Sequence, residues 1–123
     1  MAVNPDFAAF LRDQFAPFGP IVIRPMFGGA GLFRDELMFG LIAYDTLYLK
    51  TDGTNREDFE RKGMRPFTYQ GRSKPTSFGY YEVPADVLED PHEMSHWAEK
   101  AFGVALSARK KKAPRRRKKD SAR

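Results

Sequence analysis

Apolar residues recur at helical spacing near both ends of the chain, which predicts two amphipathic helices. The first would begin after Asn4 as N-cap, with Pro5 in its first turn, and would end by Pro17. The last would begin at Asp90 and Pro91, which take the same two roles. The apolar stripe of the first helix is Phe7, Phe10, Leu11, Phe15 and Phe18, and that of the last is Met94, Trp97, Ala98, Ala101, Phe102 and Ala105.

The stretch that follows the first helix is rich in β-branched and aromatic residues and in short turns, which is typical of antiparallel strands. A strand is predicted to begin over 21–23, with Pro25 at an edge or a bend, and to resume over 32–34 after an interruption by Gly28, Gly29 and Gly31. Further strands are predicted over 37–44 and 47–50. Segment 37–44 is apolar on both faces, so we expect a central strand. Its expected faces are Leu37, Phe39, Leu41 and Ala43 on one side, and Met38, Ile42 and Tyr44 on the other.

A second, short helix is predicted over 54–62, with Thr54 and Glu57 as a capping box and Gly63 after its end. Two more strands follow over 67–69 and 77–83, joined by a polar loop over 70–75. The order α-β3-α-β2-α predicts an α+β fold, an antiparallel sheet of about five strands with helices packed on it.

Charge divides the chain into a mildly acidic body and a strongly basic end. Residues 1–108 carry 11 Lys and Arg against 15 Asp and Glu, a net charge of −4. Residues 109–123 carry 10 against one, a net charge of +9. We therefore predict one domain over 1–108 and a disordered basic tail over 109–123, because Pro114 and the density of like charge oppose regular structure.

A tail of this composition neutralises phosphates without reading sequence, which predicts non-specific nucleic-acid binding. It has no aromatic residue on which bases could stack. Two alternatives stay open, an anionic membrane surface and a solubilising tail with no partner. The predicted phosphate-binding residues are Arg109, Lys110, Lys111, Lys112, Arg115, Arg116, Arg117, Lys118 and Lys119.

Several classes of protein are excluded by composition. The chain has no Cys, which excludes a disulfide framework, thiolate metal sites and thiol nucleophiles. No apolar run approaches the roughly 20 residues of a membrane span, and the N-terminus has no signal-peptide pattern. We expect a cytoplasmic protein without membrane partner, associated with the nucleoid where its tail binds DNA.

The segment His92-Glu93-Met94-Ser95-His96 spells the H-E-x-x-H pattern of zinc hydrolases, in which two His bind the metal and Glu polarises water. Here it falls in the first turn of a helix, where Glu93 has a simpler role as the N3 partner of Asp90. Glu99 follows the second His by only three positions, too few for the usual third ligand. We expect His92 to be solvated and His96 to lie on the helix flank, and we predict no catalysis, metal, cofactor or small-molecule substrate.

Five segments in order resemble the N-terminal domain of the TfoX/Sxy family of competence regulators. They are Arg24-Pro25-Met26-Phe27-Gly28-Gly29, Gly31-Leu32-Phe33-Arg34-Asp35, Leu47-Tyr48-Leu49-Lys50, Pro66-Phe67-Thr68-Tyr69 and Tyr80-Tyr81-Glu82-Val83-Pro84. The resemblance runs from about Phe7 to Leu106. It implies an α+β fold like that of type III secretion chaperones. It also implies a cytoplasmic bacterial protein that acts on other macromolecules without catalysis.

These segments also have a physical interpretation. Gly28 and Gly29 are predicted to bend the backbone, by a positive φ or a close approach, more than to form a ligand loop. Tyr80 and Tyr81 must point to opposite faces of their strand. If helices cover one face only, the other carries an exposed aromatic patch for a protein partner or a second copy; the alternative is that the last helix covers it. The family-motif residues that could form a partner surface are Arg24, Pro25, Met26, Phe27, Gly28, Gly29, Tyr80 and Tyr81.

The leading hypothesis is therefore a non-enzymatic bacterial accessory regulator. Its body would hold a protein partner or a second copy, and its tail would associate with DNA or RNA. An alternative is a chaperone-like protein-binding module with no nucleic-acid role. A remote alternative is a zinc-dependent hydrolase that uses His92, Glu93 and His96.

Overall fold

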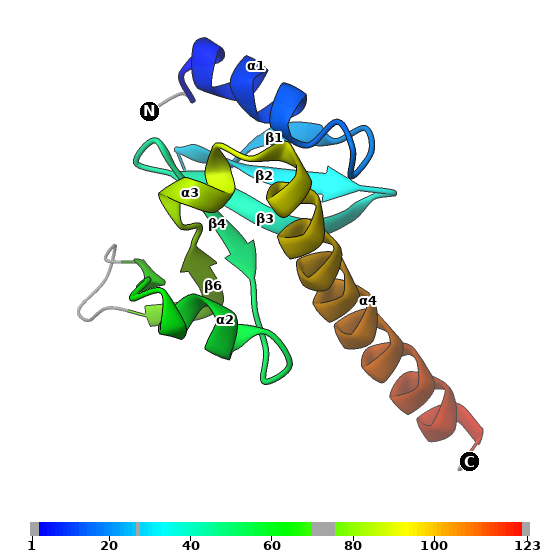
Figure 1. Cartoon of the computed structure of the whole chain (residues 1–123). Coiled ribbons are helices and arrows are strands. Elements are labelled where there is room, and N and C mark those ends of the chain that lie inside the picture. The colour runs from blue at the N-terminus through cyan, green and yellow to red at the C-terminus, as the bar shows by residue number, and fades with distance from the viewer. Residues whose placement is uncertain (1–2, 27, 70–75, 122–123) are drawn as a thin grey trace.

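The computed structural model describes residues 3–26, 28–69 and 76–121. Within them the chain forms six strands and four helices, which confirms the α+β class (Figure 1). The elements in chain order are α1 (Pro5–Gln14), β1 (Val22–Met26), β2 (Gly29–Arg34), β3 (Leu37–Ala43), β4 (Thr46–Lys50), α2 (Arg56–Arg61), β5 (Pro66–Tyr69), β6 (Thr76–Glu82), α3 (Ala85–Leu88) and α4 (Pro91–Ser121).

All six strands belong to one antiparallel sheet with the order β1-β2-β3-β4-β6-β5. The sequence prediction counted about five, because it did not settle that β1 and β2 are separate strands. Pro25 lies in β1, at the edge of the sheet as expected, where its missing N–H costs no ladder bond. Phe27 and the predicted loop over 70–75 lie outside the described residues.

Tight two-residue turns join β2 to β3 and β3 to β4. Asp35 and Glu36 have φ of 51° and 64°, and Tyr44 and Asp45 have φ of 54° and 58°. Two successive left-handed residues match the right-handed twist of the flanking strands, which is why such turns close hairpins. The first turn lies where the sequence predicts it, and the second begins one residue earlier than expected.

A β-bulge in β3 corrects the predicted faces of that strand. Leu32 of β2 pairs with Gly40. The next residue, Phe33, pairs with Met38, so Phe39 is an extra residue on β3.

Past the bulge the alternation of β3 is inverted. Phe39 and Ile42 are both in the core although they lie three positions apart. Leu41 therefore points away from the core, not with Phe39 as the simple alternation predicts, and Ile42 takes its place.

The helix starts follow their caps with one exception. Asn4 Oδ1 accepts from the backbone N–H of Asp6 at 2.7 Å, and Asp90 Oδ1 accepts from that of His92 at 3.0 Å, as predicted. Thr54 does not cap α2, because the N-cap position falls one residue later, at Asn55. The Thr54 hydroxyl donates instead to Asp52 Oδ1 at 2.6 Å. Helix α3, a single turn after Pro84, was not predicted.

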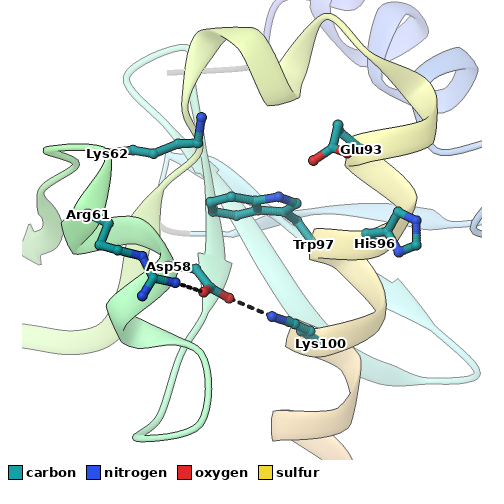
Figure 2. A pocket seen from close by; sticks show the side chains of 7 residues that line it. All are labelled: Asp58, Arg61, Lys62, Glu93, His96, Trp97 and Lys100. Atoms are coloured by element: carbon teal, nitrogen blue, oxygen red, sulfur yellow. Dashed lines mark hydrogen bonds and ion pairs between the residues drawn. The ribbon is translucent and has the colours of Figure 1, made fainter.

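The loop into α2 is held instead by Asn55, of which 2% is exposed. Its side chain accepts from the backbone N–H of Asp52 at 2.9 Å and donates to the carbonyl of Lys50 at 3.0 Å. Helix α2 is then tied to α4, because Asp58 lies 2.7 Å from Lys100 Nζ (Figure 2).

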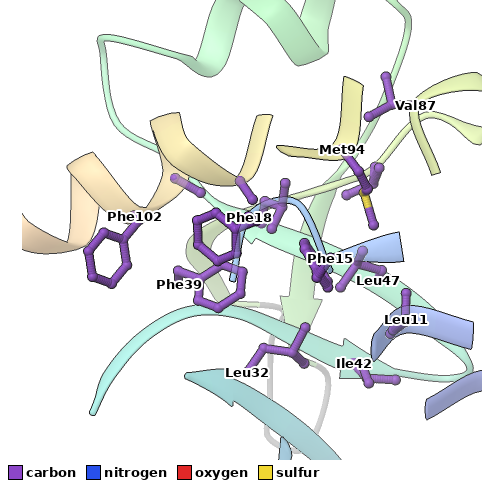
Figure 3. Packing of buried hydrophobic residues seen from close by; sticks show 14 of the residues in the cluster. Leu11, Phe15, Phe18, Leu32, Phe39, Ile42, Leu47, Val87, Met94 and Phe102 are labelled. Atoms are coloured by element: carbon purple, nitrogen blue, oxygen red, sulfur yellow. The ribbon is translucent and has the colours of Figure 1, made fainter. Parts of the chain in front are cut away.

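The hydrophobic core lies between one face of the sheet and the helices. At its centre the rings of Phe15, Phe18, Phe39 and Phe102 are in contact, with centroids 4.9 to 6.1 Å apart (Figure 3). Rings of this kind add about 0.5–1.5 kcal/mol per pair beyond the area they bury. Since α1, α4 and the core side of the strands share this cluster, the described helices cover the same face of the sheet.

Helix α4 continues to Ser121 and thus through the basic segment. The helix thus enters the segment 109–123, for which the sequence predicts a disordered tail. Lys, Arg and Ala are strong helix formers, and in this structure they outweigh Pro114. The division of the chain at residue 108 stays a prediction.

Candidate functional site

The second face of the sheet, which we call the open face, carries one continuous cross-strand row. Residues paired across antiparallel strands point to the same side, so the pairings alone define it. From β1 to β6 the row consists of Arg24, Gly31, Leu41, Tyr48 and Glu82. All five lie outside the core cluster.

Apolar side chains surround this row. A Cβ atom at Gly31 would lie 3.0 to 3.2 Å from Met26 Sδ, the Phe33 ring and Met38 Sδ, so these three side chains meet over Gly31. Phe33, Met38, Leu41 and Tyr48 are each partly exposed. The Arg24 guanidinium lies 5.0 Å from the centre of the Phe33 ring. The row is thus uncharged at its centre and charged at its two ends, Arg24 and Glu82.

Tyr80 and Tyr81 point to opposite faces, as the sequence predicts. Tyr81 pairs with Leu49 on the core side and its ring contacts Phe59 at 5.8 Å. Tyr80 pairs with Lys50, and the Lys50 ammonium lies 5.1 Å from its ring centre.

Burial changes the pKa of two tyrosines on the open face. Only 7% of Tyr80 is exposed, and this burial raises the pKa of its phenol. Burial also raises the pKa of Tyr48, and the negative charge of Glu82 raises it further. The Tyr48 ring contacts Phe67, with centroids 5.1 Å apart. This end of the open face is therefore a packed aromatic cluster.

The two motif glycines have backbone roles. Gly28 has a φ of 77°, in the left-handed region. A Cβ atom at Gly29 would overlap the carbonyl oxygen of Ile42 on β3. The expectation of a positive φ or a close approach is confirmed, with one glycine for each. The use of Arg24, Pro25, Met26 and the two tyrosines as a partner surface stays a prediction.

The predicted phosphate-binding residues follow the point where α4 leaves the core. Ala105 is buried and Leu106 is half-buried, whereas Arg109 and Lys110 are exposed. The remaining seven basic residues, from Lys111 to Lys119, belong to the same helix, and their side chains lie outside the described part. In Figure 1 this end of α4 points away from the sheet.

An open depression of about 360 Å³ lies between α2 and α4 (Figure 2). Asp58, at its rim, accepts from Arg61 at 2.8 Å and from Lys100 at 2.7 Å, and nearby Lys62 pairs with Asp86 at 2.8 Å. Its floor is Trp97, whose ring meets Phe59 edge to face at 4.8 Å. Since these charges compensate one another, we interpret the depression as part of the packing contact between α2 and α4.

The H-E-x-x-H segment does not assemble a metal site in the described residues. His92 and His96 are both exposed, as expected, and their ring centres are 5.0 Å apart. Glu99 is engaged elsewhere, 3.2 Å from Arg34. No group of three His, Cys, Asp or Glu in the described ranges could hold a metal ion. Across the same residues, no helix is long and apolar enough to cross a membrane.

Of the row, only Arg24 is among the site residues that the sequence predicts; Gly31, Leu41, Tyr48 and Glu82 were missed. The sequence gives the alternation within a strand but not its pairing with another. The bulge moreover assigns Leu41 to the face opposite the expected one. Covariation between residues that pair on neighbouring strands, such as Leu41 with Tyr48 and Tyr48 with Glu82, is the sequence signal that could reveal the row.

The fold and the open face define a small α+β domain that is covered by helices on one side of its sheet. The chain belongs to the TfoX N-terminal domain family, whose model matches residues 13–105.

Two relatives illustrate this membership. The chain is 31% identical over 77 residues to DNA transformation protein TfoX1 of Aliivibrio fischeri (strain ATCC 700601 / ES114). The matched segment covers 59% of this chain and 37% of that protein. It is also 31% identical over 90 residues to the uncharacterized 12.7 kDa protein in trpE 5′region of Spirochaeta aurantia. This match covers 73% of this chain and 72% of that protein. The chain thus spans little more than a third of the length of TfoX1.

Proposed function

We propose that the protein is a non-enzymatic regulatory or accessory protein of the bacterial cytoplasm, whose basic helix end associates with nucleic acid and whose body holds a protein partner. The observation that carries the nucleic-acid role is the division of α4. Its first half supplies the core, and its second half collects the basic residues beyond the last core contact. Phosphates can therefore reach these cations without approaching an acidic body.

The family relation supports a role near DNA, since one relative is named a DNA transformation protein. It does not by itself extend to this chain, which matches only part of that relative. The charge pattern supplies the independent argument: phosphate contacts give affinity without sequence information.

The test is fluorescence anisotropy of labelled duplex DNA and RNA at several salt concentrations. We expect the full chain to bind both, with an affinity that falls about 10³-fold between roughly 50 and 200 mM salt if about six phosphates are contacted. A chain ending at residue 108 keeps Phe102 and Leu106 and should lose this binding.

A matched control keeps the length of the chain. Replacing the nine basic residues between 109 and 119 by Gln preserves helix formers and should abolish binding as fully as truncation does. Absence of binding by the full chain at low salt would overturn the nucleic-acid role.

A second candidate is a chaperone-like protein-binding module, which the partly exposed apolar residues of the open face favour. In that case truncation at residue 108 leaves partner binding unchanged. A substitution on the open face, such as Leu41→Asp, then removes it. The same two variants thus separate the candidates.

A further inference from the structure

We propose that the open face is covered by a second copy of this chain, in a two-fold dimer whose axis runs along β3. The inference deepens the proposed docking role of the body and rests on it, but it is independent of the nucleic-acid role of α4. It is argued from the row that joins Arg24 to Glu82.

The row is complementary in charge to itself. Its ends are a cation on β1 and an anion on β6, and the residues between them are uncharged. Strand β3 lies midway, two strands from β1 and two from β6. A two-fold axis along β3 exchanges the two ends, so Arg24 of each copy meets Glu82 of the other.

Arg24 and Glu82 cannot pair with each other within one chain. Neighbouring strands are about 4.8 Å apart, so four intervals separate Arg24 from Glu82 by about 19 Å. Both charges border the apolar centre of the row, where a fixed partner sets the register. Beside Glu82 the chain itself places the exposed Arg65, whose backbone carbonyl accepts from the backbone N–H of Glu82. The facing ends of two copies supply that partner twice.

The centre of the row suits contact between like surfaces. On the axis, Leu41 of one copy would pack on Leu41 of the other. Phe33 and Met38 flank it, and methionine side chains adapt to fill irregular gaps. A two-fold interface is necessarily self-complementary, with one patch used by both copies. Two sheets that pack face to face in this way lie about 10 Å apart.

The test uses two charge-reversed full-length chains, Arg24→Glu and Glu82→Arg, in sedimentation velocity over a wide range of concentrations. In either homodimer, like charges meet at both ends of the row. We expect self-association at least about tenfold weaker than in the unmodified chain. Mixed together, the two chains pair opposite charges at both ends, so the mixture should dimerise about as well as the unmodified chain.

The mixing experiment is specific for the proposed symmetry, because no contact within a chain is restored by mixing. Arg12→Glu, which makes the same charge change on an exposed position of α1, serves as control and should dimerise normally. Circular dichroism establishes that each variant is folded. Should a reversal fail to fold, Leu41→Asp tests the axis directly, because it places two carboxylates opposite each other outside the core.

Two results would overturn the proposal. One is an unmodified chain that stays monomeric at every concentration, which would leave the open face to a different protein. The other is a mixture that associates no better than its separate components. Either result can be obtained while full nucleic-acid binding persists, so the failure of the dimer and the failure of the proposed nucleic-acid role are distinguishable.

Discussion

The two faces of one sheet differ in what their apolar residues do. On the helix-covered face, Phe39 and Leu49 are fully buried against α1 and α4. On the open face, their sequence neighbours Met38 and Tyr48 are equally apolar in body but partly exposed. The buried residues of the covered face stabilise the fold, whereas the partly exposed residues of the open face are available for association. The comparison shows that the hydrophobicity of a residue does not by itself indicate whether the residue stabilises the fold or is available for binding. The face of the sheet on which the residue lies indicates this.

The largest expected effect comes from removing a ring from the covered face. Phe39→Ala should lower the free energy of unfolding by about 3–5 kcal/mol, because it leaves a cavity among Phe15, Phe18 and the sheet. Leu41→Ala, two positions away on the open face, should cost about 1 kcal/mol or less in the monomer. Urea unfolding of both variants measures the difference. Equal losses would contradict the division into two faces.

Next in size is the close approach between β2 and β3. Gly29→Ala should destabilise the fold by about 2–4 kcal/mol, because the new methyl group overlaps the carbonyl oxygen of Ile42 and the strands must separate. Gly53→Ala is the matched control, since its Cβ atom meets nothing within 4 Å, and should change stability by no more than about 0.5 kcal/mol. Thermal unfolding of the pair checks this.

A smaller effect is expected at the rim of the covered face. The Arg34 guanidinium lies 4.3 Å from the ring centre of Phe18 and 4.2 Å from that of Phe102, and it donates to the Phe18 carbonyl at 3.0 Å. Arg34→Met removes these contacts and should cost about 1–3 kcal/mol.

Glu99→Gln isolates the ion pair with Arg34, which is partly solvated. It should cost under about 1 kcal/mol, as exposed pairs do. Denaturation curves that rank Glu99→Gln above Arg34→Met would show that the charge, not the stacking, holds this rim.

The smallest expected effect concerns the tyrosines of the open face at alkaline pH. Burial raises the pKa of Tyr80 and of Tyr48 above the ordinary value of 10.0, so the folded state holds these protons more tightly than the unfolded state. Their contribution to stability is therefore complete below pH 10 and is lost as the pH rises through the raised values. Alkaline unfolding should be less steep in Tyr80→Phe. An unchanged profile would mean that Tyr80 titrates as a solvated phenol.

Local signals in the sequence predict the class of the fold and several of its boundaries. The caps Asn4 and Asp90 could be predicted because each has a side-chain oxygen and directly precedes a Pro, a signal that two neighbouring residues contain. The Thr54 cap was wrong, since the helix begins one residue later, after Asn55. The row from Arg24 to Glu82 could not be predicted, because its register depends on four strand pairings at once. The length of α4 was missed because Pro114 was weighed above the helix-forming residues around it.

The bulge at Phe39 also limits how this chain can change in length. Strand β3 runs in two phases, and the extra residue is what lets Phe39 and Ile42 share a side. Deleting Phe39 or Gly40 would remove the extra residue and leave a regular strand whose other side chains keep their faces. Deleting any other residue of the strand would turn one end of it over and would send either Leu37 or Ile42 out of the core. Among homologues of this domain, a deletion within β3 should therefore fall at the bulge, and a relative of the same length without the bulge should carry the opposite pattern of apolar residues along half of that strand.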